Sequence, residues 1–148
     1  MISAIPHILV VDDEPAIREL LSEILTDTGY RVSCAEDGRQ ALDCTVLEVP
    51  DLIMSDIQMP RMHGLALVER VRADGHMMPI ILISSWTPPP GLPGVRFIRK
   101  PFDVDQIIAA VALDLMSAGS GARAAHQPRR ELMLAGERAR SVTVSLFA

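Results

Sequence analysis

The sequence predicts an α/β protein in which a parallel sheet carries helices on both faces. Short aliphatic runs at residues 8–11, 51–55 and 80–83 alternate with segments whose apolar residues recur at helical spacing. Such runs are typical of strands buried on both faces, and their alternation with helices is typical of a doubly wound sheet. At 148 residues the chain has the length of one domain.

The first helix, which follows the first strand, is the clearest element. One of its faces carries apolar residues at the i, i+3, i+4, i+7 spacing: Ile17, Leu20, Leu21, Ile24 and Leu25. Asp13 is predicted to cap this helix, Pro15 suits its first turn, and Gly29 is predicted to end it.

The later elements follow from the same patterns. Further strands are predicted at 31–35, 51–55, 79–84 and 95–99, and further helices at 38–47, 64–72 and 104–116. Residues 85–94 contain four prolines and two glycines, a composition in which an ordinary helix is not stable. The fourth helix of the alternation is therefore predicted to be missing, with a Pro-rich loop in its place.

Charge and composition separate a body, residues 1–117, from a C-terminal tail, residues 118–148. The body holds nine Lys or Arg against seventeen Asp or Glu, which argues against nucleic acid as its partner. The tail holds five Arg against two Glu and begins with a Gly/Ser-rich stretch, so it is predicted to be basic and flexible. No apolar stretch approaches the roughly twenty residues of a membrane helix, and the protein is predicted to be cytoplasmic.

Acidic residues and one lysine stand at the ends of the predicted strands. Asp12 and Asp13 follow the first strand, Asp56 follows the third, Ser84 closes the fourth, and Lys100 closes the fifth. In a doubly wound sheet these carboxyl ends meet at the edge where ligands bind. Lys100 is the only lysine beside thirteen arginines, and its compact ammonium can approach a single phosphoryl oxygen closely. The pattern predicts an oxygen-rich pocket beside one positive charge.

The predicted pocket suits a divalent cation and a phosphoryl group. Crowded carboxylates repel one another, and Mg²⁺ relieves the repulsion because it takes oxygen ligands and keeps waters that a phosphate can displace. With the ion on one side and Lys100 on the other, a phosphoryl group at Asp56 would have its charge neutralised from two directions. Asp56 is the predicted nucleophile, and the Ser84 hydroxyl is predicted to donate to a phosphoryl oxygen.

Each of these residues has a simpler interpretation on its own. Asp13 alone would be a helix cap, and Asp56 alone a turn residue before Met59-Pro60. Ser84 alone would be a satisfied strand-end hydroxyl, and Lys100 alone a solvated charge. Their occurrence together at the ends of neighbouring strands favours a shared site.

Five segments occur in an order and at a spacing that are specific when taken together. They are Ile8–Pro15, Gly38 with Ala41-Leu42, Pro50–Pro60 with Gly64, Pro79–Ser84, and Lys100–Phe102. Through them, residues 7–117 resemble the response-regulator receiver domains of two-component signalling, the CheY-like family. The resemblance implies a flavodoxin-like fold whose five-stranded sheet has the order 2-1-3-4-5.

The resemblance also implies roles for the pocket residues. Asp56 would be the phosphoacceptor, and Mg²⁺ would be bound by Asp12, Asp13, Asp56 and the backbone carbonyl of Gln58. The phosphoryl group would come from a phosphohistidine on a sensor histidine kinase or a histidine phosphotransfer protein. Asp56 would therefore be modified to an aspartyl phosphate rather than turn over an external substrate.

Other implied roles concern contact with the phosphoryl group and switching. Ser84 and Lys100 would contact the group, and Ser84 and Phe97 would be the switch residues, with Phe97 limited to changes of packing because it has no hydroxyl. The Lys100-Pro101 peptide bond is expected to be cis. Trp86 has two possible roles. It either packs as an anchor of its loop, or it lies at the pocket entrance and influences dephosphorylation together with Gln58.

The leading functional hypothesis is a single-domain response regulator. It would not be an enzyme but a phosphoacceptor switch in a phosphorelay, whose output is altered affinity for a further, unidentified protein. The alternative is a receiver-like adaptor that binds partners without phosphorylation, against which the intact acidic pocket argues. A Mg²⁺-dependent phosphatase of the haloacid-dehalogenase kind would place Asp-x-Asp after the first strand, where this chain has Asp12-Asp13-Glu14.

Overall fold

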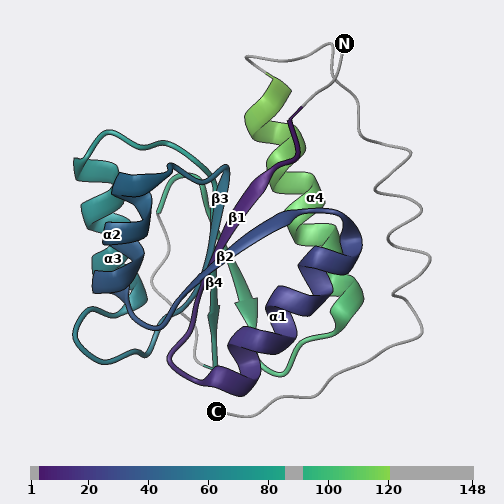
Figure 1. Ribbon diagram of the computed structural model, residues 1–148, viewed down its shortest axis with the longest axis horizontal. Helices are drawn as coiled ribbons and strands as arrows, with labels where there is room; N and C mark the ends of the chain where they lie inside the picture. The colour runs from purple at the N-terminus through teal and green to yellow at the C-terminus, as the bar shows by residue number, and fades with distance from the viewer. Residues whose placement is uncertain (1–3, 86–91, 121–148) are drawn as a thin grey trace.

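The computed structural model describes residues 4–85 and 92–120 (Figure 1). Strands and helices alternate in the predicted order within these ranges. The strands are β1 (His7–Val11), β2 (Arg31–Ala35), β3 (Leu52–Asp56), β4 (Ile80–Ser84) and β5 (Val95–Arg99). The helices of the described part are α1 (Pro15–Thr28), α2 (Gly38–Leu47), α3 (Gly64–Ala73) and α4 (Val104–Ser120).

The five strands form one parallel sheet in the order β2-β1-β3-β4-β5, which confirms the predicted fold class. The three inner strands β1, β3 and β4 are buried along their whole length, whereas the edge strands β2 and β5 are partly exposed. The order reverses between β1 and β3, so their carboxyl ends border the crevice in which such sheets bind ligands.

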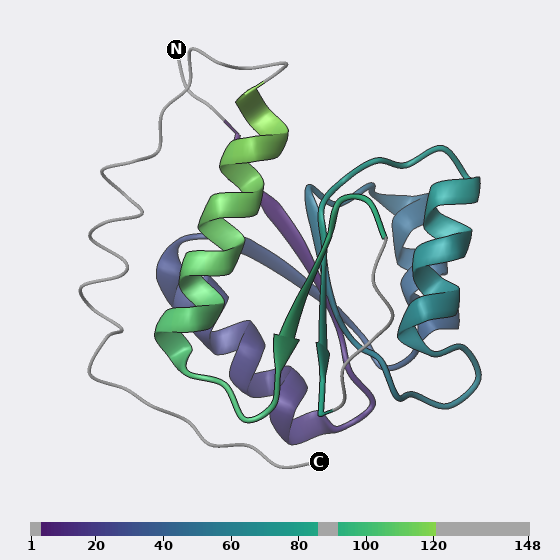
Figure 2. The ribbon, with the colours of Figure 1, turned by 180° about the vertical axis from the view of Figure 1, so that it is seen from behind.

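Two helices cover each face of the sheet. Figures 1 and 2 show α1 and α4 on one face and α2 and α3 on the other. Because side chains alternate along a strand, β1 divides between the two cores: Ile8 and Val10 pack with α1 and α4, while Leu9 and Val11 pack with α2 and α3. The aliphatic β1 run is therefore buried on both sides, as its sequence predicts.

Several predicted boundaries differ from the structure, most of them by one residue. Asp56 is the last residue of β3 rather than the residue after it. The Asp13 cap is wrong, because the N-cap of α1 is Glu14, which makes no side-chain capping bond; Gly29 ends the helix as predicted. Helix α4 continues to Ser120, past the predicted end at residue 116, since adding a residue to an existing helix gains a hydrogen bond without the cost of starting a new helix.

The segment between β4 and β5 is described only at its ends. Ser85 and residues 92–94 are not helical, which agrees with the predicted loss of a helix. Trp86 and the other residues up to 91 lie outside the described residues. The tail beyond Ser120 lies outside them too. In the part of the chain that the structure describes, no helix is long and apolar enough to span a bilayer.

Gly64 lets α3 begin directly against the end of β3. Its N–H donates to the carbonyl oxygen of Ile57 at 2.8 Å. A Cβ at position 64 would lie 2.6 Å from the carbonyl oxygen of Asp56 and 3.0 Å from the Cα of Ile57. Both are main-chain atoms, which cannot yield as the end of a flexible side chain would, so the approach of α3 to Asp56 requires glycine.

Gly64→Ala is expected to lower the free energy of unfolding by about 1 to 3 kcal/mol, because the new methyl group overpacks the end of β3. Gly119→Ala in α4 is the matched control: a Cβ there meets nothing within 4 Å, so the better helix former is expected to raise stability by about 0.5 kcal/mol. Urea unfolding measures both. Equal stability of Gly64→Ala and the native chain would contradict the steric interpretation.

Candidate functional site

Three aspartates gather at the carboxyl edge of the sheet. Asp12 and Asp13 lie in the loop between β1 and α1, and Asp56 ends the neighbouring strand β3. One carboxylate oxygen from each lies within 4.8 Å of the other two. Asp12 and Asp56 are buried, while Asp13 is exposed. The structure thus brings together the acidic residues that the sequence places at two strand ends.

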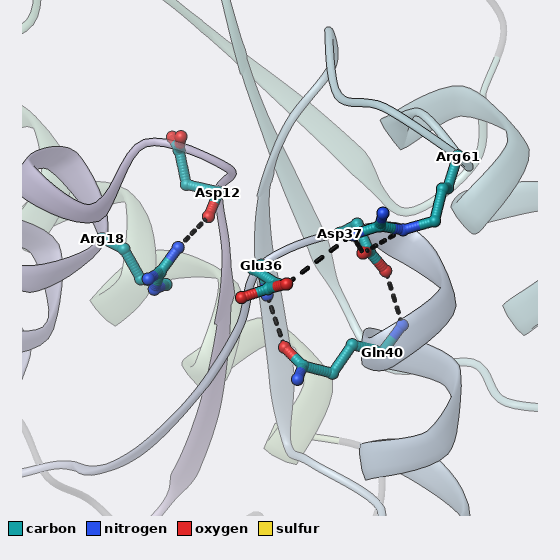
Figure 3. A network of polar contacts seen from close by, with 6 residues as sticks. All are labelled: Asp12, Arg18, Glu36, Asp37, Gln40 and Arg61. Atoms are coloured by element: carbon teal, nitrogen blue, oxygen red, sulfur yellow. Dashed lines mark hydrogen bonds and ion pairs between the residues drawn. The ribbon is translucent and has the colours of Figure 1, made fainter.

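Main-chain contacts hold Asp12 in place. Its N–H continues the sheet by donating to the carbonyl oxygen of Ala35 at 3.1 Å. Its Oδ1 accepts from the N–H of Glu14 at 2.9 Å. Its own carbonyl oxygen accepts from Nη1 of Arg18 at 2.6 Å, a contact that ties the first turn of α1 back to the loop (Figure 3). Asp12 is therefore held both by the end of β2, through Ala35, and by the start of α1, through Glu14 and Arg18.

Asp56 faces the ammonium group of Lys100. The Nζ atom of Lys100 lies 3.5 Å from Oδ1 of Asp56, and the same oxygen accepts from the N–H of Ile57 at 2.9 Å. The Lys100 side chain is 2% exposed and that of Asp56 is 7% exposed. Two nearly buried opposite charges are tolerated because each has the other as a partner.

The ends of β4 and β5 bring Ser84 beside Lys100. The N–H of Lys100 donates to the carbonyl oxygen of Ser84 at 2.9 Å, and Ser84 itself is 3% exposed. The Lys100-Pro101 peptide bond is cis, as the resemblance implies. Ser84, Lys100 and Asp56 therefore lie on three adjacent strand ends of the order β3-β4-β5.

The remaining predicted residues lie around this group. Gln58 is exposed, two residues after Asp56 in the loop between β3 and α3. Phe97 is half-buried in β5, where it is aligned with Leu82 and packs against the core beneath α2 and α3. Trp86 lies outside the described residues, so neither interpretation of it is tested.

Burial disfavours the ionised forms of the two buried carboxylates, Asp12 and Asp56. Burial raises the pKa of Asp12 from 3.8 to about 6, with a contribution from the negative charge of Asp56. Burial also raises the pKa of Asp56, although the positive charge of Lys100 opposes that shift. A cation placed among the three carboxylates would stabilise their ionised forms.

The donor set fits Mg²⁺. Carboxylate oxygens are hard ligands of the kind this ion prefers, and the exposed Asp13 leaves one side of the cluster open to water, several molecules of which Mg²⁺ usually retains. Asp12, Asp13 and Asp56 are the residues that would hold the ion. The ammonium group of Lys100, 3.5 Å from Oδ1 of Asp56, would be a second positive charge beside the ion.

Sequence patterns missed three residues that shape the site. Arg18 could have been found from its place in the first turn of α1, six residues after Asp12, because such a side chain can reach back to the preceding loop. Asp37 and Arg61 form an ion pair beside the loop that follows Asp56, and their separation of 24 residues left no local signal.

Known proteins resemble this chain in sequence. The model of the family described as the response regulator receiver domain matches residues 8–112. The chain is 34% identical to the sporulation initiation phosphotransferase F of Bacillus subtilis over 110 residues, covering 70% of this chain and 89% of that protein. It is 42% identical to the response regulator MprA of Mycolicibacterium vanbaalenii over 79 residues, covering 53% of this chain but only 34% of the length of MprA.

A solved structure resembles the chain in fold as well. The chemotaxis protein CheY4 of Vibrio cholerae superposes with a TM-score of 0.70 at 31% sequence identity, covering 75% of this chain and 99% of CheY4. The family match, the strand order and the acidic edge agree with one another. The chain therefore belongs to the receiver-domain family of two-component response regulators.

Proposed function

We propose that this chain is a phosphorylatable switch in which Asp56 accepts a phosphoryl group from the phosphohistidine of a sensor histidine kinase or histidine phosphotransfer protein. The observation that carries the proposal is the buried Asp56 carboxylate, 3.5 Å from the Lys100 ammonium and within the cluster formed with Asp12 and Asp13. A relative of similar length is itself named a phosphotransferase, which supports a role in a phosphorelay.

The transfer needs an ionised Asp56. A carboxylate oxygen of Asp56 forms a bond to phosphorus while the phosphorus–nitrogen bond of the donor breaks, and the electron pair of that bond leaves with the imidazole nitrogen. Lys100 favours the ionised carboxylate and can hold a phosphoryl oxygen. The three aspartates and the backbone carbonyl of Gln58 would hold Mg²⁺, which would further neutralise the phosphoryl charge.

The product is an aspartyl phosphate on the protein, so the chemistry is self-catalysed modification and hydrolysis rather than turnover of an external substrate. The new phosphoryl oxygens can accept from the Ser84 hydroxyl at the end of β4. Because the main chains of Ser84 and Lys100 are joined by a 2.9 Å hydrogen bond, movement of one strand end affects the other. Phe97 then repacks, and the protein-binding surface around β5 changes.

Incubation of the full chain with acetyl phosphate and Mg²⁺ is expected to add one phosphoryl group, detected by intact-mass spectrometry. Asp56→Asn and a chelator are each expected to abolish the addition, because one removes the nucleophile and the other the cation. If the native chain neither gains mass nor binds Mg²⁺, the proposal fails, and the receiver-like adaptor that acts without phosphorylation becomes the better hypothesis.

Lys100→Gln is expected to slow phosphorylation of Asp56 by about a hundredfold, since it removes a buried positive charge from the transferring group. Without Lys100 the pKa of Asp56 rises further, so the remaining rate is expected to increase with pH as that carboxyl ionises. Rates with acetyl phosphate at several pH values measure this. A pH-independent rate in the variant would argue against Lys100 as the counter-charge of Asp56.

Asp12→Asn is expected to stabilise the metal-free protein at about pH 8 and not at about pH 4. The folded pKa of Asp12 lies near 6, above the value of 3.8 for an unperturbed Asp, so stability from this group is present below about pH 4 and lost as pH rises through about 6. Allowing for solvent screening, the expected gain is about 1 kcal/mol.

Thermal unfolding of both chains with and without Mg²⁺ checks that difference. The cation should remove the advantage of Asp12→Asn, because it relieves the same repulsion in the native chain. If Asp12→Asn is less stable than the native chain at about pH 8 without metal, the ionised Asp12 carboxylate does not destabilise the fold, and the prediction is wrong.

A further inference from the structure

The loop between Asp56 and α3, residues 57–63, is closed at its base and strained at its tip. At the base, the N–H of Gly64 donates to the carbonyl oxygen of Ile57. At the tip, the N–H of Met62 donates to the carbonyl oxygen of Pro60 at 2.7 Å, and the central residue of this three-residue turn, Arg61, has a φ of 65°. A side-chain-bearing residue rarely adopts such a turn, so contacts outside the loop must hold it.

Two contacts from the turn between β2 and α2 hold the tip. Nε of Arg61 donates to Oδ2 of Asp37 at 2.7 Å, and Nη2 of Arg61 contacts the same oxygen (Figure 3). The N–H of Gly38 donates to the carbonyl oxygen of Met62 at 3.2 Å, and a Cβ on Gly38 would lie 2.5 Å from that oxygen. We call these two contacts, Arg61 to Asp37 and Gly38 to Met62, the clasp.

The Asp37 carboxylate is buried and accepts several hydrogen bonds. Its side chain is 4% exposed, and its Oδ1 accepts from the N–H of Gln40 at 2.8 Å as the N-cap of α2. The Gln40 N–H and then Arg61 hold the pKa of Asp37 below its usual value. Removing one partner of a buried charge costs more than breaking a pair between two exposed side chains, so the Arg61 bond matters although most of the Arg61 side chain is exposed.

We propose that Arg61 is a positioning residue for the phosphoacceptor site: through the clasp it holds the loop that carries Gln58 and so sets the affinity of the acidic pocket for Mg²⁺. The inference rests on the proposed function, in which the Gln58 carbonyl joins the three aspartates around the ion. A displaced loop would withdraw that carbonyl while leaving all three carboxylates in place. Groups that orient metal ligands in this way typically change metal affinity by roughly 10- to 100-fold when they are removed.

Titration of the full chain with MgCl₂, followed by the amide NMR signals of residues 12, 13 and 56, tests the proposal. Arg61→Asn removes the guanidinium group, and asparagine tolerates the positive φ at this position. Asp37→Asn removes the negative charge of the carboxylate but retains an oxygen that can accept as the N-cap of α2. Each is expected to raise the Kd for Mg²⁺ about tenfold. The double variant is expected to be no worse than Arg61→Asn alone, because that variant has already lost the contact with Asp37 together with the ion pair between Arg61 and Glu36 at 3.6 Å.

Two further variants separate positioning from net charge. Arg39→Gln removes an exposed arginine from the same end of α2 and is expected to leave the Kd unchanged. Arg61→Lys keeps the charge without the planar fork and is expected to give an intermediate Kd. If the native chain binds Mg²⁺ and the folded Arg61→Asn and Asp37→Asn variants bind it equally well, the proposal is wrong and the clasp only stabilises the fold. If the native chain binds no Mg²⁺, the proposed function fails, and this inference fails with it.

Discussion

The pairing of a buried carboxylate with a buried ammonium at the carboxyl edge of the sheet is the constraint around which the site is arranged. Asp56 and Lys100 are both nearly inaccessible to water and lie 3.5 Å apart. An isolated carboxylate in such a place would tend to take up a proton, whereas the positive charge of Lys100 favours the ionised form of Asp56. Among the residues that the structure describes, the second buried carboxylate, Asp12, has no ammonium or guanidinium group in an ion pair with it, and burial raises its pKa to about 6. This imbalance of negative over positive charge makes the pocket suited to a divalent cation.

The backbone near Asp56 is arranged to keep this edge compact. Gly64 brings α3 against the end of β3, and the clasp holds the strained loop between them. Thus the segments that surround Asp56 are held by close main-chain approaches and one partly buried ion pair, in addition to the packing of Ile57, Met59 and Met62 against the core beneath α2 and α3. Polar contacts of that kind help to preserve the positions of the polar groups at this edge of the sheet.

At the opposite edge of the sheet, where β4 and β5 begin, Arg72 joins the segments that enter these two strands. The guanidinium of Arg72, near the end of α3, donates to the carbonyl oxygens of His76 at 3.0 Å and Met78 at 2.8 Å, and to that of Gly94, just before β5, at 3.4 Å. One side chain thus joins the segment that enters β4 to the segment that enters β5. Burial lowers the pKa of Arg72, in keeping with a guanidinium that satisfies main-chain oxygens.

Local patterns in the chain are enough to predict the elements and the residues that meet at the site. Periodicity is a local property, and parallel strands share one carboxyl edge, so the pattern of residues alone predicts that Asp12, Asp56 and Lys100 lie together. The strand order came from resemblance to a family. Three features could be read only from the folded chain: Glu14 rather than Asp13 is the N-cap of α1, Asp12 and Asp56 are buried whereas Asp13 is exposed, and Asp37 accepts from Arg61. Those outcomes depend on groups far apart along the chain, whose approach is set by the packing of whole elements and leaves no trace in a local pattern.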